Sequence, residues 1–151
     1  MKSIKLLAIG LMLISGLNAN AQAENSKSDI QQITETLMDY IEGTANGELN
    51  RLRKAFHPNF NLYTVTEADS LRIRSGEAYI ANFKEGGKSN RIGRIISIDY
   101  ENDAAIAKAE IVVPNWKIFT DYFLLLKYEG SWKIVQKSYT SREYPKSTEK
   151  K

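Results

Sequence analysis

The sequence predicts an α+β fold in which three helices pack on a curved, mainly antiparallel sheet. Three observations favour this class. Apolar residues recur at spacings of three and four before residue 84, as helices require. Two long pairs of alternating segments follow, each joined by a two-residue turn. Cysteine is absent, so a hydrophobic core must supply the stability that disulfides give small secreted domains. Helices followed by antiparallel strands are typical of α+β domains.

The first 23 residues have the pattern of a secretory signal peptide. Lys2 and Lys5 make a basic start, the segment from Leu6 to Leu17 is largely apolar, and small residues suitable for cleavage follow. The apolar run has about 12 residues, whereas about 20 are needed to cross a bilayer. We therefore expect a secreted or periplasmic protein with no membrane span, after cleavage near Ala21 or Ala23.

The charge of the chain argues against nucleic acid as a partner. The formal net charge is +3, but the expected signal peptide holds two lysines and no acid, so the mature chain is nearly neutral. No basic patch with interleaved aromatic residues is visible. Part of the remaining positive charge lies in residues 142–151, a polar tail that contains Pro145 and is expected to be disordered. The domain itself is expected to span residues 28–141.

The helices are expected at residues 29–41, 49–56 and 75–83. Ser28 or Asp29 can cap the first helix, and Gly43 follows its last apolar residue. Pro58 stops the second helix, because the residue before a proline disfavours helical backbone angles. Ser75 is a suitable N-cap for the third. All three helices therefore come before the two long hairpins.

The strands are expected at residues 60–65, 71–74, 92–100, 103–113, 119–128 and 131–139. The first long hairpin turns at Glu101-Asn102 and the second at Glu129-Gly130, where Asn and Gly tolerate the positive φ that tight turns need. Because loop length sets the register, Leu125 should face Ile134 and Asp121 should face Ser138, with Phe123 opposite Gln136.

Alternation along these strands predicts which side chains share a face. One face of the second hairpin should carry Phe119, Asp121, Phe123, Leu125, Trp132, Ile134, Gln136 and Ser138. The corresponding face of the first hairpin should carry Ile92, Arg94, Ile96, Ile98, Ala105, Ala107, Ala109 and Ile111. These are the more apolar faces, so we expect the helices to cover them.

Three pieces of the sequence together resemble a known family: YIEGTANGELNRLRKAFHPNFNL, RIGRIISIDYENDAAIAKAEI and FTDYFLLLKYEGSWKIVQKSY. The most specific parts are AFHP at 55–58, TDY at 120–122 and GSWKIVQK at 130–137. They are similar to the putative lumazine-binding family of the nuclear transport factor 2-like superfamily, relatives of the SnoaL-like polyketide cyclases. The similarity runs from about Ile30 to Tyr139.

This resemblance implies a cone-shaped roll, also described as cystatin-like, whose helices close a pocket against the concave sheet. It also implies frequent homodimers through the outer face of the sheet. The superfamily contains isomerases, dehydratases, cyclases, ligand-binding proteins and scaffolds, so the resemblance alone assigns no reaction.

Asp121 is the strongest candidate for a functional residue, because it interrupts an apolar strand. A buried carboxylate without a partner costs several kcal/mol. Asp121 is therefore expected to pair with Arg94 or to bond Ser138 and backbone amides, or else to face a water-filled pocket as an anchor or general base. A register that exposes it is the third alternative.

His57 is a weaker catalytic candidate. In AFHP its imidazole can satisfy backbone groups at the helix end or act as a proton shuttle, and the first interpretation is favoured. The chain has one histidine and no cysteine, so no metal-ligand spacing is present. Neither a serine nucleophile motif nor a glycine-rich phosphate loop is visible. No cofactor is expected.

The sequence leaves three functions open. The preferred one is an exported protein that binds a small, partly apolar molecule. The second is an isomerase, dehydratase or cyclase-like enzyme that uses Asp121 as acid or base, with Tyr63, His57 or Arg94 assisting. The third is a non-catalytic dimeric interaction module. The expected pocket residues are Tyr63, Arg94, Trp116, Phe119, Asp121, Phe123, Gln136 and Ser138.

Overall fold

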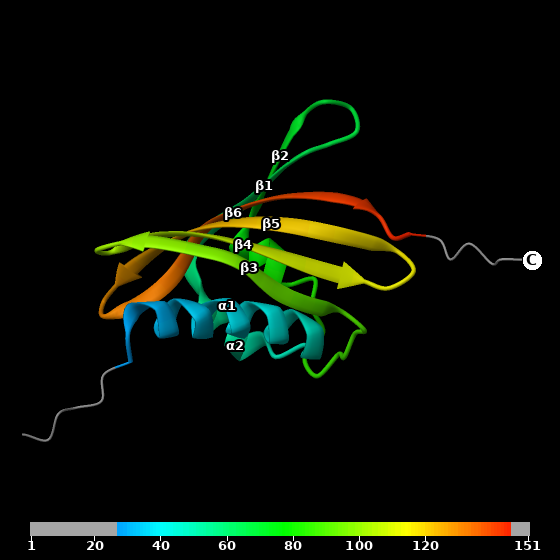
Figure 1. Cartoon of the computed structure of the whole chain (residues 1–151). Helices are drawn as coiled ribbons and strands as arrows, with labels where there is room; N and C mark the ends of the chain where they lie inside the picture. The colour runs from blue at the N-terminus through cyan, green and yellow to red at the C-terminus, as the bar shows by residue number, and fades with distance from the viewer. Residues whose placement is uncertain (1–26, 146–151) are drawn as a thin grey trace, which may run out of the picture.

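The computed structural model describes residues 27–145, so the expected signal peptide lies outside the described residues. Its helices are α1 (Asp29–Asn46), α2 (Leu49–Ala55) and α3 (Gly76–Ile80). Its strands are β1 (Phe56–Val65), β2 (Leu71–Ser75), β3 (Ile92–Glu101), β4 (Ala104–Val113), β5 (Lys117–Tyr128) and β6 (Ser131–Glu143). Helices α1 and α2 lie against one face of the sheet (Figure 1). The predicted α+β class is confirmed.

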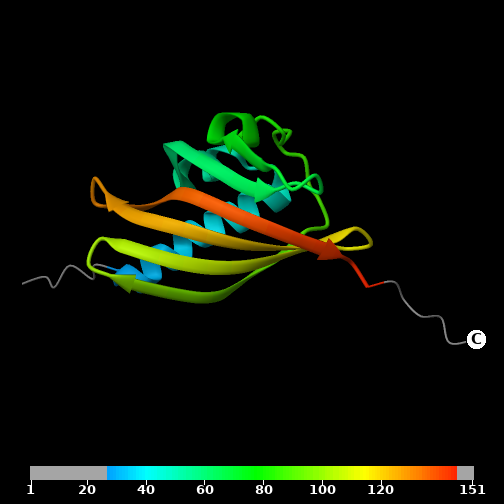
Figure 2. The same cartoon turned by 90° about the horizontal axis from the view of Figure 1, so that it is seen from above.

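The six strands form one mixed sheet in the order β2-β1-β6-β5-β4-β3. Strand β1 runs parallel to β6, and the other neighbours are antiparallel. Seen from above, the long strands cross over α1 (Figure 2). The sheet therefore presents one face to the helices, called the inner face here, and one outer face.

Helix α1 is longer than its periodicity predicts. Ser28 caps it through a capping box with Gln31, as expected. The helix does not end before Gly43 but continues to Asn46, and Gly47 forms the left-handed C-cap. Gly43 is buried inside the helix, and a Cβ there would lie 2.8 Å from the Leu52 side chain. Its missing side chain therefore lets α2 approach α1 closely.

Gly47→Ala is expected to cost more stability than Gly86→Ala, although both glycines have positive φ. Left-handed backbone costs a non-glycine residue about 1–2 kcal/mol at either site. A Cβ on Gly47 would also overlap backbone atoms of Lys84 and Gly87, whereas a Cβ on Gly86 would meet open space. Overpacking adds about 1–3 kcal/mol. Urea denaturation measures the difference, and equal losses would show that this crowding relaxes freely.

The second hairpin contains a β-bulge that changes which β6 side chains face the helices. The Glu129-Gly130 turn has positive φ at both residues, and Leu125 faces Ile134 as predicted. Val135 is then left unpaired, so Phe123 faces Lys137 and Asp121 faces Tyr139. The predicted partners Gln136 and Ser138 are therefore wrong, and the inner face carries Lys137 in their place.

A bulge also shifts the first hairpin. Its turn is Asn102-Asp103, one residue later than predicted, and Ile96 is left unpaired between Ile95 and Ser97. Ile95 consequently packs against the core, whereas Ile96 is exposed. Ile92 and Arg94 also lie on the outer face, so the prediction that they face the helices is wrong. Beyond the bulge the expected inner positions hold: Ile98, Ala105, Ala107, Ala109 and Ile111 belong to the core or pack against it.

The remaining boundaries differ by a few residues. Ser75 caps α3 as expected, but the helix ends at Ile80 rather than Phe83. Strand β1 begins at Phe56, directly after α2. Strand β6 reaches Glu143, two residues into the expected tail, and residues 146–151 lie outside the described chain.

Candidate functional site

Three polar side chains meet inside the core: Tyr40 from α1, Asp121 from β5 and Lys137 from β6. The Tyr40 hydroxyl donates to Oδ2 of Asp121 over 2.6 Å. The Lys137 ammonium donates to the same oxygen over 3.2 Å and to the Tyr40 oxygen over 2.9 Å. Asp121 is 1% exposed and Lys137 4% exposed. Of the alternatives open for Asp121, the structure shows a buried, paired carboxylate, and its partners are Lys137 and Tyr40 rather than Arg94 or Ser138.

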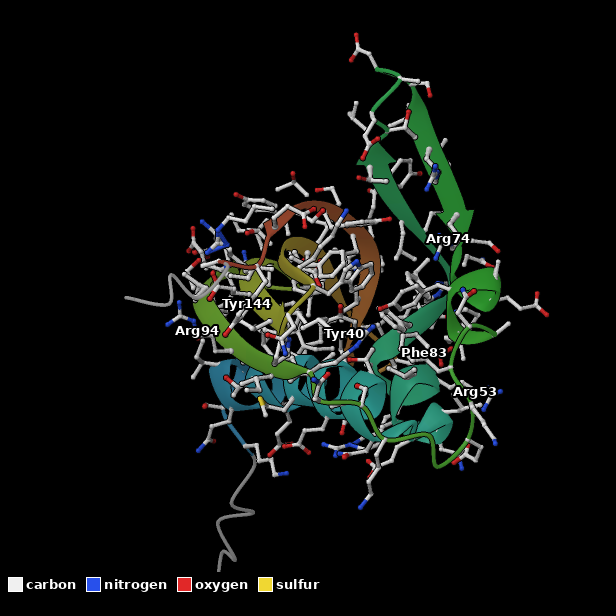
Figure 3. The ribbon with its side chains drawn as sticks, turned by 90° about the vertical axis from the view of Figure 1, so that its right-hand side faces the viewer. Tyr40, Arg53, Arg74, Phe83, Arg94 and Tyr144 are labelled. Atoms are coloured by element: carbon white, nitrogen blue, oxygen red, sulfur yellow. The ribbon has the colours of Figure 1, made fainter. Side chains whose placement is uncertain are left out.

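Aromatic rings surround the ammonium group of this network. Lys137 Nζ lies 4.8 Å from the ring centroid of Tyr40, 5.0 Å from that of Tyr79 and 5.3 Å from that of Tyr139. Cations at such distances are attracted to the ring faces. Figure 3 shows Tyr40 between α1 and the inner face of the curved sheet. Within residues 27–145, every buried side-chain nitrogen and oxygen has a hydrogen-bond partner.

The network keeps Lys137 charged and Tyr40 neutral at neutral pH. Burial disfavours the charged lysine, but the Asp121 carboxylate and nearby tyrosines outweigh it, so the pKa of Lys137 is raised. Burial, together with the Asp121 charge, raises the pKa of Tyr40 well above its ordinary value. Both side chains therefore remain hydrogen-bond donors to Asp121.

The raised pKa of Lys137 predicts the pH range in which its ion pair stabilises the fold. The contribution is complete below the ordinary lysine pKa of 10.5 and declines as the pH rises through the higher folded-state pKa. We expect the stability difference between wild type and Lys137→Met to stay constant from about pH 7 to pH 9 and to shrink only above the ordinary pKa. Urea midpoints measured across this range test it, and a difference that shrinks below pH 9 would contradict it.

The expected pocket residues do not form one site. Phe123 and Asp121 are buried on the inner face, and Phe119 packs against the core. Arg94 instead pairs with Glu110, with 2.8 Å between its Nη2 and Oε1, in an exposed contact. Trp116 lies between β4 and β5, is 53% exposed and meets Phe119 edge-on.

Three other expected residues lie together on the outer face. Tyr63, Gln136 and Ser138 line a shallow depression of about 240 Å³. Tyr63 faces Ser138 across the parallel β1/β6 pair. Because Asp121 lies on the inner face, none of the three can contact its carboxylate through a shared cavity.

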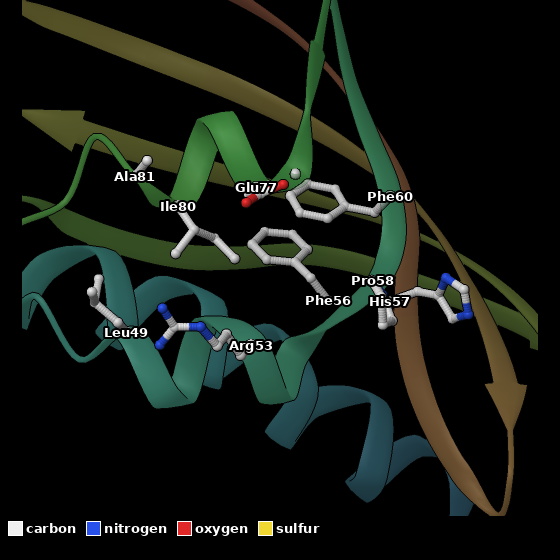
Figure 4. A pocket seen from close by; sticks show the side chains of 10 residues that line it. Leu49, Arg53, Phe56, His57, Pro58, Phe60, Glu77, Ile80 and Ala81 are labelled. Atoms are coloured by element: carbon white, nitrogen blue, oxygen red, sulfur yellow. The ribbon is translucent and has the colours of Figure 1, made fainter.

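His57 has the local role that the sequence favoured. Its Nδ1 accepts a hydrogen bond from the backbone N–H of Asn59 over 3.2 Å. Its ring meets Tyr128 edge-on, with 5.2 Å between centroids. Figure 4 shows the imidazole pointing away from the side chains of the neighbouring cleft. The ring therefore fixes the backbone just after α2.

A cleft of about 530 Å³ opens between α2, β1 and α3 (Figure 4). Phe56 and Phe60 form its wall, with their rings stacked 3.7 Å apart and nearly parallel. The other lining residues are Leu49, Arg53, His57, Pro58, Gly76, Glu77, Ile80 and Ala81. A second, more polar groove of about 670 Å³ runs beside the β1–β2 hairpin and includes Ala68 and Arg72.

One layer of aromatic side chains separates the cleft from the buried network. The Phe56 ring is 5.7 Å from Tyr40 and 6.1 Å from Tyr79, between ring centroids. Both tyrosine rings contact the Lys137 ammonium. A molecule in the cleft would therefore meet Phe56 before it could reach Asp121.

Sequence reasoning missed Tyr40, Lys137 and Tyr79 as neighbours of Asp121, and it missed Arg53 as a cleft residue. The demand of a buried carboxylate for a cation could have indicated Lys137, which lies on the adjacent strand. Within residues 27–145, no three acidic or histidine side chains are grouped as metal ligands. No helix in that range is long and apolar enough to cross a membrane.

Comparison with known proteins places the chain in a family. The family model described as "Putative lumazine-binding" matches residues 28–140. An aldolase, FrzH, from a Cladobotryum species is 25% identical over 124 residues, which are 80% of this chain and 96% of that protein.

Solved structures show the same fold. A nuclear transport factor 2-like protein of unknown function from Shewanella baltica is 25% identical, covering 78% of this chain and 99% of its own, with a TM-score of 0.69. Another from Methylobacillus flagellatus is 29% identical, covering 78% and 96%, with a TM-score of 0.67. This chain belongs to the putative lumazine-binding family and has the nuclear transport factor 2-like fold.

Proposed function

We propose that this protein binds a small, partly apolar molecule in the cleft between α2, β1 and α3. The observation that carries the proposal is the stacked pair Phe56 and Phe60 at the wall of a cleft of about 530 Å³. Small-molecule sites have volumes of roughly 300–1,000 Å³, with mainly apolar walls and a few polar groups. Arg53 and Glu77 are such polar groups. The sequence predicted a binding site around Asp121, whereas the cleft proposed here lies on the opposite side of the Phe56 ring.

Native mass spectrometry of the purified protein tests this proposal. A retained small molecule should add a discrete mass to the wild type. Ala81→Trp, which fills the cleft from its exposed rim, should abolish that added mass. Ala68→Trp introduces the same side chain into the polar groove and should leave it unchanged. Equal occupancy in both variants would exclude the cleft.

We also propose that this protein acts outside the cytoplasm, either in the periplasm or after secretion. The basic start at Lys2 and Lys5, the apolar segment and the small residues near Ala21 and Ala23 support export. N-terminal sequencing of protein recovered from the extracytoplasmic fraction tests this part, with Gln22 or Glu24 expected as the new first residue. An intact Met1 on that protein would contradict cleavage.

A second candidate function is acid–base catalysis on a carbonyl substrate by Asp121. The buried network with Tyr40 and Lys137 favours it, and so does the similarity to a protein named an aldolase. This role requires the Phe56 ring to move aside and admit the substrate from the cleft. Asp121 would then take a proton next to a carbonyl group, and Lys137 or Tyr40 would donate to the carbonyl oxygen. Exchange of α-hydrogens of cyclohexanone in heavy water tests the activity. Catalysed exchange should disappear in Asp121→Asn, and no exchange with the wild type would count against the role.

We also expect the protein to form a homodimer through the outer face of its sheet. Apolar side chains that are exposed there include Ile106, Tyr122, Leu124 and Leu126. A contiguous exposed apolar surface is typical of an interface. Sedimentation should show a dimer for the wild type and a monomer for Leu124→Glu. A wild type that stays monomeric at high concentration would contradict the dimer.

A further inference from the structure

We infer that the molecule bound in the cleft is a flat aromatic carboxylate, with its carboxylate on Arg53 and its ring against Phe56. This inference rests on the proposed function of the cleft and adds the chemical class of the ligand. It is carried by the pairing of charges around α2, by the shape of the aromatic wall and by the position of Glu77.

Of the three cations of α2, Arg53 is the one that has no carboxylate partner in the described part of the chain. Arg51 contacts Asp39, Glu42 and Glu48, and Lys54 contacts Asp39. Among residues 27–145, Arg53 has no carboxylate within salt-bridge distance, and its side chain lines the cleft. Figure 4 shows its guanidinium group on the cleft side of α2, near Leu49 and Ile80. A planar guanidinium offers two parallel N–H donors, which match the two oxygens of a carboxylate.

The wall beside Arg53 is flat and aromatic. Phe56 and Phe60 lie nearly parallel, at an interplanar angle of 4°. A Cβ on Gly76 would overlap the Phe60 ring, so the missing side chain lets this ring lie against the start of α3. Aromatic rings bind other rings in offset or edge-on arrangements. Phe56 and Phe60 are 3% and 2% exposed, so a ligand meets the edges of these rings. A flat ring can make such an edge-on contact next to the guanidinium group.

Glu77 sets the direction of the ligand. It lines the same cleft from α3, where a carboxylate in the first turn suits the helix dipole. Glu77 would repel a carboxylate placed at its end of the cleft and so directs the ligand anion toward Arg53. Both charges can be satisfied by one molecule with an acid at one end and a neutral or hydrogen-donating ring at the other.

Isothermal titration calorimetry with two matched probes tests the inference. The probes are 2-naphthoate and 2-naphthamide, which share a ring and differ in charge. The wild type should bind 2-naphthoate about tenfold more tightly, the ratio expected for one charge-assisted contact. Arg53→Gln should remove this preference while still binding the amide. Arg72→Gln, which removes an equal charge from the polar groove, should keep the preference.

The outcomes separate the inference from the proposed function. If both probes bind with equal affinity and Ala81→Trp blocks them, the cleft binds rings but the charge assignment is wrong. A preference for naphthoate that survives Arg53→Gln also overturns the assignment to Arg53. If neither probe binds, the ligand class is overturned, while the mass retained by the wild type and lost in Ala81→Trp still decides the cleft. If both probes bind and Ala81→Trp blocks neither, the cleft is overturned as their site.

Discussion

Lys137→Met is expected to destabilise the folded protein by about 3–5 kcal/mol, because it leaves the Asp121 carboxylate buried without a cation. Methionine replaces most of the volume of the lysine stem, so the loss of stability comes from the missing positive charge rather than from a cavity. Tyr40 would remain as a single neutral donor to a group that is 1% exposed. Since domains are stable by about 5–15 kcal/mol, this is a large share of the total. Urea denaturation of both proteins measures the effect.

Two control variants test whether the stability loss comes from breaking a buried ion pair or from removing any positively charged side chain. Arg94→Met breaks an ion pair whose arginine side chain is 69% exposed, and such pairs contribute about 0–1 kcal/mol. The double variant Asp121→Asn/Lys137→Met removes both charges and should recover much of the loss, because the two sites are coupled. Equal losses for Lys137→Met and Arg94→Met, or a double variant that sums the two single losses, would contradict this account of the core.

Phe56→Ala is expected to cost about 3–5 kcal/mol and to open a path from the cleft to Lys137. Phe56 is 3% exposed and contacts the rings of Phe60, Tyr40 and Tyr79. Removing its ring takes away the layer between the cleft and the ammonium group. Lys137 should then become reactive to reductive methylation, more slowly than an exposed lysine because its pKa is raised, and peptide mass spectrometry detects the product. In the wild type it should remain unmodified, while the exposed Lys84 reacts in both proteins.

Leu125→Ala supplies the matched control for Phe56→Ala. Leu125 is completely buried, but it faces Ile134 and Ala105 in the sheet and does not line the cleft. Its loss should destabilise by a comparable amount, about 2–5 kcal/mol, so it corrects for labelling through global unfolding. Equal methylation of Lys137 in the two variants would mean that unfolding, and not a local opening, exposes the amine.

Local features, such as helix caps and tight turns, were predictable from the sequence because a few neighbouring residues determine them. Ser28 caps α1 through contacts with Gln31, and Glu129-Gly130 form the tight turn of the second hairpin. In both cases the side chains or backbone angles that matter lie within a short stretch of chain. The helices before the hairpins and the apolar alternation of β4 and β5 then defined the fold class.

The composition of the candidate site was not predictable in the same way, because two bulges invert the faces. Ile95 and Ile96 are adjacent and alike, so alternation cannot tell which one faces the core. Packing against α1 decides it. A Cβ on Gly93 would overlap the Ile41 side chain, so Gly93 lies on the inner face, and Ile95, two residues on, shares that face. In β6, Val135 is the extra residue, and it places Lys137 where strict alternation puts Gln136 and Ser138. The need of Asp121 for a cation was the available signal.

The parallel pairing of β1 with β6 has a consequence for the order in which this chain can fold. Phe56 pairs with Ile134, and Tyr63 pairs with Ser138. Strand β1, the first in the chain, therefore cannot pair with β6 until this last strand has been synthesised. Contacts between such distant segments form slowly, because a long loop must close first. Until β6 is available, β1 has an open edge and the sheet cannot be completed. For the export proposed above, this order of pairing would delay completion of the sheet until nearly all of the chain had been synthesised, which would favour passage of an unfolded chain through a translocation pore.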